Sequence, residues 1–153
     1  GAVAGDGLRV GLDLLVGEPD PVQPDSGRTV WFSPADGIVT GNGQFSADSV
    51  TSGLSEESWR ANTLVRPGIY WVVALYRTLS PLRTATTVSL LARTSSVQKT
   101  TSKSGLLPGQ SYTAFRIQVN TSAVTIETVP EPELSESIRS SIRSWSRQNS
   151  SRK

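Results

Sequence analysis

The chain has 153 residues, enough for one domain with a substantial hydrophobic core. Hydrophobic residues make up 36% and charged residues 18% of it, but the net charge of +2 and the recurring apolar runs exclude an intrinsically disordered chain. Cys, His and Met are absent, which excludes disulfides, thiolate-bound zinc, thiol nucleophiles and the commonest general base.

The N-terminal part predicts one strand followed by an acidic loop. Residues 8–16 alternate between apolar and other side chains, a pattern typical of a half-buried strand. The next ten residues hold three prolines and three acids, namely Glu18, Asp20 and Asp25. Proline has no N–H to donate to a ladder, so this run predicts an extended surface loop. The prolines also keep the carboxylates apart, so we expect no calcium site there.

The next segments predict short strands joined by tight turns. Residues 28–33 and 37–40 read as strands, and 45–50 as a returning strand. Between them, Gly41-Asn42-Gly43 is a turn signal, because an Asn-Gly pair supplies the positive φ of a tight hairpin. For residues 54–60 the sequence leaves two alternatives open, one helical turn or an irregular loop.

The strongest segment is residues 69–76, a run of eight residues that is apolar on both faces. Such a strand has to be covered on both sides, either by a second sheet and a loop or by another subunit. The run is far shorter than the roughly 20 apolar residues of a membrane-spanning helix. We therefore expect no membrane span.

Four further strands are predicted at 84–91, 95–100, 111–119 and 124–128. Eight or nine short strands without interleaved helices indicate an all-β fold, an antiparallel β-sandwich or jelly roll. We assign this domain to residues 1–130.

The tail, residues 131–153, differs in kind. It begins with an acidic Pro/Glu spacer, after which Ile138, Ile142 and Trp145 form the apolar stripe of a short amphipathic helix. Ser135 is the predicted N-cap. A helix of about 12 residues is marginal in isolation, so we expect it to dock on its own chain or on a neighbouring one.

Charge is divided along the chain. Residues 1–60 carry a net charge of −6, whereas residues 61–126 carry +7 and no acid at all. Three interpretations remain open: pairing of the two sets inside the domain, contact between the acidic face of one copy and the basic face of another, and binding of an anion such as a glycan sulfate or nucleic acid.

Only carboxylates and hydroxyls are available for catalysis. Glu56 and Glu57 are the sole adjacent acids, and their side chains are expected to diverge, whereas glycoside hydrolysis needs two carboxyl groups that face each other. There is no G-x-S-x-G elbow and no phosphate-binding glycine loop. We expect neither enzymatic activity nor a bound metal or other cofactor.

The candidate contact residues fall into two groups. The first is apolar and is expected at a subunit interface or under the docked helix: Tyr70, Trp71, Tyr76, Ile138, Ile142 and Trp145. The second is basic and is expected to contact an anion or a partner, nucleic acid included: Arg139, Arg143 and Arg147.

The chain resembles two kinds of known protein. The run from Leu107 to Tyr112, Leu-Pro-Gly-Gln-Ser-Tyr, resembles the L-x-P-G-x-x-Y corner of fibronectin type III and related immunoglobulin-like sandwiches, although here Leu107 adjoins the proline. The Ser/Thr/Val-rich composition, the Pro-Gly-Ile-Tyr start of the strand at 67–70 and the Arg-bearing tail are similar to coat proteins of non-enveloped icosahedral viruses, with their jelly-roll shells and projecting domains.

The second resemblance implies a structural protein of a virus capsid, located in the virion. It would assemble as a homo-oligomer through symmetric contacts and take part in host attachment at a receptor or glycan. Coat proteins are often cut from longer precursors, and without a Met we expect Gly1 to arise by processing or excision. The alternative is a carbohydrate-binding or adhesin module of a cell-surface or phage-tail protein, extracellular or surface-exposed, in which Trp31 and Trp71 contact the sugar.

Overall fold

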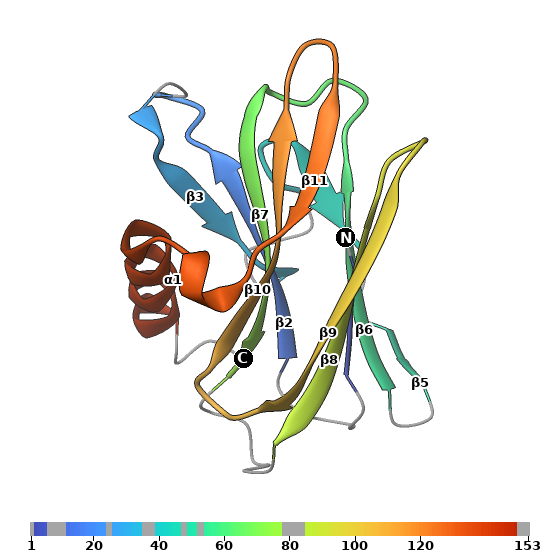
Figure 1. The fold of residues 1–153 in the computed structure, drawn as a ribbon, viewed down its shortest axis with the longest axis vertical. Coiled ribbons are helices and arrows are strands. Elements are labelled where there is room, and N and C mark those ends of the chain that lie inside the picture. Colours follow the sequence, from blue (N-terminus) through green and yellow to red (C-terminus); the bar gives the residue numbers. More distant parts are fainter. Residues whose placement is uncertain are drawn as a thin grey trace.

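The computed structural model describes residues 2–5, 12–23, 26–34, 39–46, 49–51, 54–77 and 85–149. Eleven strands form two antiparallel sheets that face each other, followed by one turn of 3-10 helix and one α-helix (Figure 1). The predicted all-β sandwich with a short C-terminal helix is therefore confirmed. The predicted strand residues 8–11, 37, 38, 47, 48 and 84 lie outside the described part, as does the loop acid Asp25.

The first sheet has six strands, in the order β4-β6-β1-β8-β9 with β5 paired to β6 off this path. Its neighbours all pair antiparallel. The strands are β1 (Ala2–Gly5), β4 (Gly43–Phe45), β5 (Ser49–Thr51), β6 (Leu54–Ala61), β8 (Thr86–Arg93) and β9 (Gln98–Leu106).

The second sheet has five strands, in the order β11-β10-β7-β2-β3, so the doubly apolar strand β7 lies at its centre. The 3-10 turn spans Glu131–Glu133, and α1 spans Glu136–Gln148. The strands are β2 (Leu12–Pro19), β3 (Thr29–Phe32), β7 (Gly68–Tyr76), β10 (Ser111–Val119) and β11 (Val124–Thr128).

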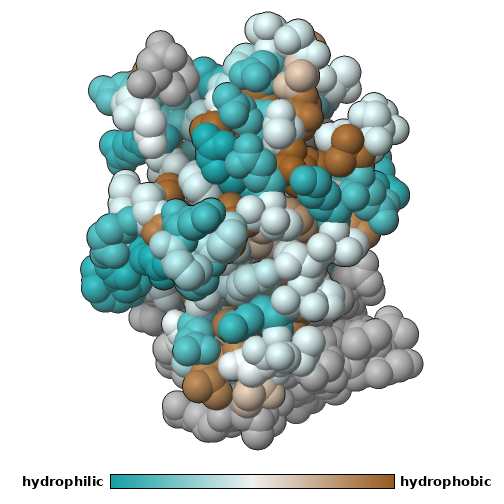
Figure 2. Space-filling model, viewed as in Figure 1, coloured by the Kyte–Doolittle hydropathy of each residue, from teal (hydrophilic) through white to brown (hydrophobic). Residues whose placement is uncertain are grey.

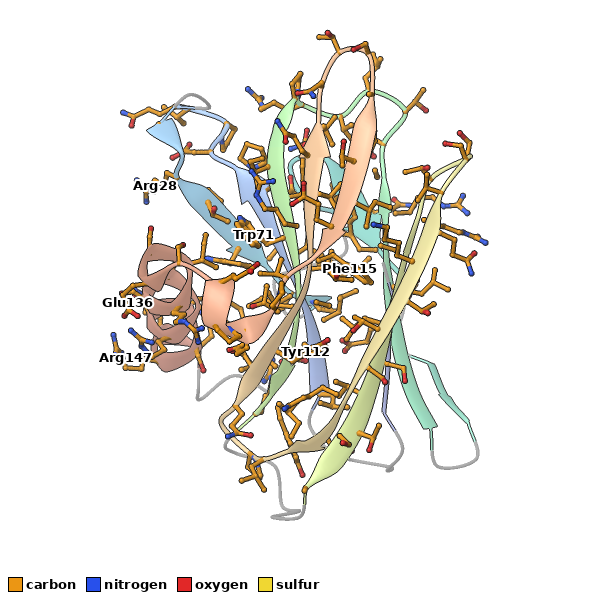
Figure 3. The ribbon with its side chains drawn as sticks, viewed as in Figure 1. Arg28, Trp71, Tyr112, Phe115, Glu136 and Arg147 are labelled. Carbon is orange, nitrogen blue, oxygen red and sulfur yellow. The ribbon has the colours of Figure 1, made fainter. Side chains whose placement is uncertain are left out.

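The main core lies between the sheets. Phe115 on β10 is fully buried there, and Tyr112 lies beside the same space, so both point from the second sheet toward the first (Figure 3). The sheets are joined by apolar side chains that alternate along the central strands. Buried members of this core include Leu12, Leu14, Val16, Val72, Ala74, Tyr76, Val88, Leu90 and Ala92.

A second core lies between the five-stranded sheet and the tail. Leu15 and Val73, which point away from the first core, pack with Trp31 of β3 and with Ile138 and Ile142 of α1. Burying an Ile side chain contributes about 1.5–3 kcal/mol, which offsets the marginal stability of a 13-residue helix. Strand β7 is thus covered on both faces, by the other sheet and by the helix of its own chain (Figure 1).

The helix begins as the sequence predicted. The hydroxyl oxygen of Ser135 accepts a hydrogen bond of 3.3 Å from the N–H of Ile138, which satisfies one of the first free amides of the helix. The predicted stripe of Ile138, Ile142 and Trp145 faces the sheet, with both isoleucines buried. The Pro/Glu spacer is one 3-10 turn with Pro130 before it.

Three predictions for the first 60 residues were wrong. Residues 54–61 are a strand, neither a helical turn nor a loop, because β6 pairs with β1, β4 and β5 despite its glutamates. Strand β2 is buried on both faces over its whole length, because on the face that was expected to be exposed Leu15 lies under α1 and Asp13 pairs with Arg77. The strand also continues into the predicted loop, where Glu18 pairs with Val30 and is only 1% exposed.

The turn at Gly41-Asn42-Gly43 is present, but for a different reason than predicted. Val39 bridges Gln44, and the N–H of Thr40 donates to the carbonyl of Gly43 at 2.9 Å. Neither Gly41 nor Gly43 has a positive φ. Instead, a Cβ at Gly43 would clash with the backbone oxygen of Arg60 and the ring of Trp59, so this glycine permits a close approach to β6.

Candidate functional site

The predicted interface residues are used inside the molecule. Tyr70 and Tyr76 are 3% and 0% exposed, and Tyr76 belongs to the core between the sheets. Trp71 lies half-buried on the opposite face of β7, toward α1 (Figure 3). Ile138 and Ile142 are buried under α1, and Trp145 is half-buried beside them. These side chains hold the sheets and the helix together, and a partner would reach most of them only by displacing α1.

The three predicted basic contact residues all lie on α1. Arg139 donates to a carboxylate oxygen of Glu131 at 3.0 Å and to the carbonyl of Leu134 at 3.2 Å. Arg143 forms an ion pair of 2.5 Å with Glu136, although both side chains are more than half exposed. Arg147 is exposed near the end of the helix. Arg139 and Arg143 are therefore already paired with acids of the same tail.

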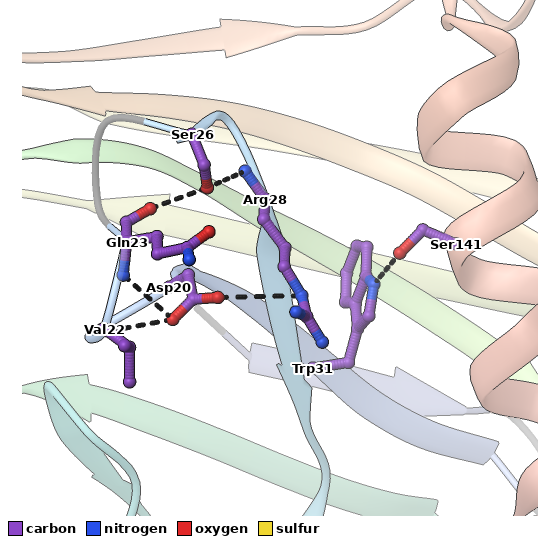
Figure 4. A network of polar contacts seen from close by, with 7 residues as sticks. All are labelled: Asp20, Val22, Gln23, Ser26, Arg28, Trp31 and Ser141. Atoms are coloured by element: carbon purple, nitrogen blue, oxygen red, sulfur yellow. Dashed lines mark hydrogen bonds and ion pairs between the residues drawn. The ribbon is translucent and has the colours of Figure 1, made fainter.

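A polar depression of about 430 Å³ lies between β3 and α1. The indole N–H of Trp31 donates to the hydroxyl of Ser141 at 2.6 Å, and Trp31 is 8% exposed (Figure 4). Nearby, Asp20 accepts from the N–H of Val22 at 2.8 Å and pairs with Arg28 at 3.6 Å (Figure 4). Trp31 thus presents no open ring face, so it is poorly placed as a stacking platform for a sugar.

The acids of the N-terminal part do not form an acidic face where the structure describes their side chains. Four such acids in residues 12–60 are all buried: Asp13, Glu18, Asp20 and Glu57. Asp13 pairs with Arg77, which is the internal pairing that the charge division allowed. Glu57 accepts a hydrogen bond of 2.6 Å from the N–H of Leu14, which joins β6 to β2 across the sandwich.

Several bases of the second segment, in contrast, remain exposed. Arg93, Lys99 and Lys103 lie on the β8–β9 hairpin, and among the described residues they have neither an ion pair nor a hydrogen-bonded side-chain partner. Burial with ion pairs or hydrogen bonds inside the domain therefore accounts for the four described acids, whereas an uncompensated positive charge is left along one edge of the first sheet.

Strand β9 forms that edge. It pairs with β8, and no other described strand covers its far side. Seven of its nine residues are exposed, a pattern that includes both faces of the strand. The sequence indicated a strand at 95–100 but missed its length. The exposure of β9 could have been predicted from one run that has no apolar side chain to bury, namely Gln98-Lys99-Thr100-Thr101-Ser102-Lys103-Ser104.

A second feature is a mostly apolar cleft of about 830 Å³ between the two sheets at one end of the sandwich. The strand ends that line it lie at the top of Figure 1, near the β10–β11 hairpin. Apolar side chains are visible there at the upper right of Figure 2. Its apolar lining includes Val16, Val72, Ile117, Val119, Val124 and Ile126.

Aromatic and basic side chains complete the cleft. Trp59 and Tyr70 line its wall with ring centroids 6.3 Å apart and planes tilted by 40°. The indole N–H of Trp59 donates to the hydroxyl of Thr40 at 3.2 Å, which fixes the ring. Arg60 and Arg93 also line the cleft, and both are exposed. No sequence pattern indicated that these four residues converge, because they come from three strands of two different sheets.

A buried polar network lies behind the cleft wall. Asn42 donates to one carboxylate oxygen of Glu18 at 2.7 Å and accepts from the N–H of Arg66 at 2.8 Å. The hydroxyl of Tyr70 donates to the carbonyl of Arg66 at 2.6 Å. Burial raises the pKa of Tyr70 to about 12, and the nearby charge of Glu18 acts in the same direction.

The Leu107–Tyr112 corner departs from the pattern that it resembles. Gly109 has φ of 89°, and its N–H donates to the carbonyl of Tyr76 at 2.7 Å, so the turn is tied to β7. The hydroxyl of Tyr112 bonds to the hydroxyl of Thr101 at 2.6 Å, whereas the tyrosine corner of immunoglobulin-like domains bonds to the backbone. Here the tyrosine links the second sheet to β9 of the first.

No protein-family model matches the chain, and neither a curated protein nor a solved structure was found to be significantly similar to it. Within the described ranges, no three acidic side chains are grouped so as to hold a metal ion. Likewise, α1, the one α-helix of the described part, is neither long nor apolar enough to cross a membrane.

Proposed function

We propose that the chain is a non-enzymatic structural domain that assembles with copies of itself, as a projecting or shell domain of a virus coat protein does. The observation that carries the proposal is β9, a nine-residue strand at the edge of a sheet that is exposed along most of its length. An edge strand presents a row of N–H and C=O groups to which another strand can pair. Host attachment at a receptor or glycan would be a role of the assembled surface.

A second copy is the partner that fits this edge best. Two antiparallel β9 strands related by a two-fold axis would join their sheets into one continuous sheet, and two-fold contacts are the commonest in homo-oligomers. The facing residues would be serines, threonines and glutamine, whose side chains form favourable cross-strand pairs. The contact would be polar, because residues 98–104 of β9 carry no apolar side chain and the apolar faces of β7 and α1 are already covered inside the chain.

The lysines restrict the register. Lysines on an edge strand commonly oppose pairing, and a register centred on Thr101 would place Lys99 directly opposite Lys103 of the other copy. A register centred on Thr100 avoids this, because Lys99 then faces Thr101. In that register Gln98 faces Ser102, and this pair occurs twice across the axis. The register also keeps clear of the irregularity that follows Lys103.

The test is the concentration dependence of the molar mass, measured by size-exclusion chromatography with light scattering. We expect the wild-type chain to associate as its concentration rises. The double variant Gln98→Glu with Ser102→Glu places two pairs of carboxylates opposite each other and should weaken association about tenfold, because like charges directly opposite are destabilising. Both positions are exposed, so folding should be unaffected.

The matched control is Gln98→Glu with Ser102→Lys, which turns both repulsive pairs into attractive ones and should associate at least as tightly as the wild type. A wild-type chain that stays monomeric at the highest attainable concentration contradicts the proposal. So does a Glu/Glu variant that associates as well as the Glu/Lys variant, because the contact would then lie elsewhere.

A further inference from the structure

The cleft at the open end of the sandwich is too large to be a packing defect. Facing sheets normally interdigitate their side chains, and voids larger than a water molecule are rare in protein interiors. Here about 830 Å³ remains between the sheets, lined mostly by apolar atoms. The volume lies within the range of about 300–1,000 Å³ that small-molecule sites occupy.

The shape of the lining favours a flexible apolar chain. Val16 and Val72 lie deep between the sheets and are 2% and 3% exposed, whereas Val124 lies at the mouth and is 42% exposed. Inward-facing residues of β10 and β11, among them Ile117 and Val119, form one wall. The walls are therefore mostly apolar from the mouth to the interior, and Glu18, Asn42 and Arg66 of the buried polar network do not line them.

The charge at the mouth is positive. Arg60 and Arg93 line the cleft from β6 and β8, are exposed, and have no ion pair or side-chain hydrogen bond among the described residues. A planar guanidinium group binds carboxylate or phosphate oxygens through two parallel hydrogen bonds. None of the described acids lines the cleft, and Glu18, whose charge acts on Tyr70, is buried.

We propose that this cleft binds an amphiphile with one apolar chain and an anionic head group, with the chain between the sheets and the head group at Arg60 and Arg93. A neutral apolar molecule would leave both arginines without a partner, and a cationic one would be repelled by them. The head group is a carboxylate, as in a fatty acid, or a phosphate, as in a phospholipid fragment. Both are bound by the same guanidinium chemistry.

Isothermal titration calorimetry with four twelve-carbon probes tests the proposal: dodecanoate, dodecyl phosphate, dodecanol and dodecyltrimethylammonium, each below its micellar concentration. We expect the two anions to bind one per chain, and dodecanol and the ammonium probe to bind about tenfold more weakly or less, because charge-assisted hydrogen bonds are lost. The ratio of the two anion affinities distinguishes a fatty acid from a phosphate ester. A shift in tryptophan emission that is present in the wild type and lost in Trp59→Phe reports binding at the cleft.

Two variants separate the head-group and chain contacts. Arg60→Gln with Arg93→Gln should lower the affinity for both anions about tenfold and leave that for dodecanol unchanged. Val119→Trp should lower the affinity for every probe, because the indole occupies the cleft. The matched control, Lys99→Gln with Lys103→Gln, removes the same charge from β9, which does not line the cleft, and should bind as the wild type does when both are measured at a concentration at which the chain is monomeric.

The proposal is overturned if no probe binds, or if dodecanol binds as tightly as dodecanoate. It is also overturned if the arginine and lysine variants lose the same affinity, since the effect would then be one of net charge alone. If Val119→Trp does not fold, the comparison of the arginine and lysine variants still decides.

Discussion

The indole nitrogen of Trp31 donates a hydrogen bond of 2.6 Å to the hydroxyl of Ser141, 110 residues further along the chain. Trp31 lies on β3, at the edge of the five-stranded sheet, and Ser141 lies on α1 (Figure 4). The bond and the hydrophobic core beneath the helix join the tail to the domain. The face of β7 that a second subunit was expected to cover is thereby closed by the chain itself.

Replacing Ser141 by Ala should destabilise the fold by about 1 kcal/mol, because the half-buried indole N–H loses its acceptor while the helix gains a little propensity. Ser140→Ala is the control, because Ser140 is exposed and lies on the same helix. This substitution therefore raises the helix propensity by the same amount without removing the hydrogen bond. Urea unfolding of the two variants gives the difference. Equal midpoints would mean that the hydrogen bond contributes nothing to docking.

Truncating Ile142 to Ala should lower the free energy of unfolding by about 2–5 kcal/mol, because this side chain is 3% exposed and fills the core between α1 and the sheet. The same truncation at Val22, which is 83% exposed, should change the stability by less than about 0.5 kcal/mol. Thermal unfolding measures both. A small effect at Ile142 would show that the helix is not firmly docked.

Much of the second half of the chain was predictable from local pattern. Strands β10 and β11 begin and end at the predicted residues, 111–119 and 124–128. The helix and its N-cap at Ser135 were also predicted, because the apolar stripe and the cap are local signals. The two apolar faces of β7 correctly indicated two covering layers.

The first half was less predictable because its structure depends on distant partners. Strand β1, residues 2–5, was missed, although it lies between β6 and β8. Glutamates in β6 disfavour a strand locally, but Glu57 is buried, where its carboxylate accepts from β2. The cleft could not be predicted from the sequence either. It depends on how far the two sheets separate at one end, and the residue pattern of a single strand does not determine that distance.

Glu57 should be important for stability, because it is buried and links two strands. Its carboxylate accepts from the N–H of Leu14, so Glu57→Ala leaves a buried amide unpaired and should cost about 2–3 kcal/mol. Glu57→Gln keeps an acceptor oxygen at the same place and should cost less. Chemical denaturation of both variants tests this, and an Ala variant as stable as the Gln variant would refute it.

Tyr70 should titrate near pH 12 in the folded protein, because burial raises its pKa to about 12 from the ordinary value of 10.0. Between pH 10 and 12 the folded state then holds more protons than the unfolded state, so stability is complete below pH 10 and falls as the pH rises through this window. Ultraviolet absorption at high pH measures the ionisation. In Tyr70→Phe the step near pH 12 should disappear, and a spectrum that still contains this step would assign it to another tyrosine.

The most direct test of assembly through β9 is hydrogen exchange of its backbone amides, measured by mass spectrometry at low and high protein concentration. Pairing of two β9 edges predicts that exchange in residues 98–103 slows as the concentration rises, because amides that face away from β8 become hydrogen-bonded. Exchange in β10, which is paired on both sides within one chain, should not change. Exchange in 98–103 that is independent of concentration while the chain is associated would contradict assembly through this edge.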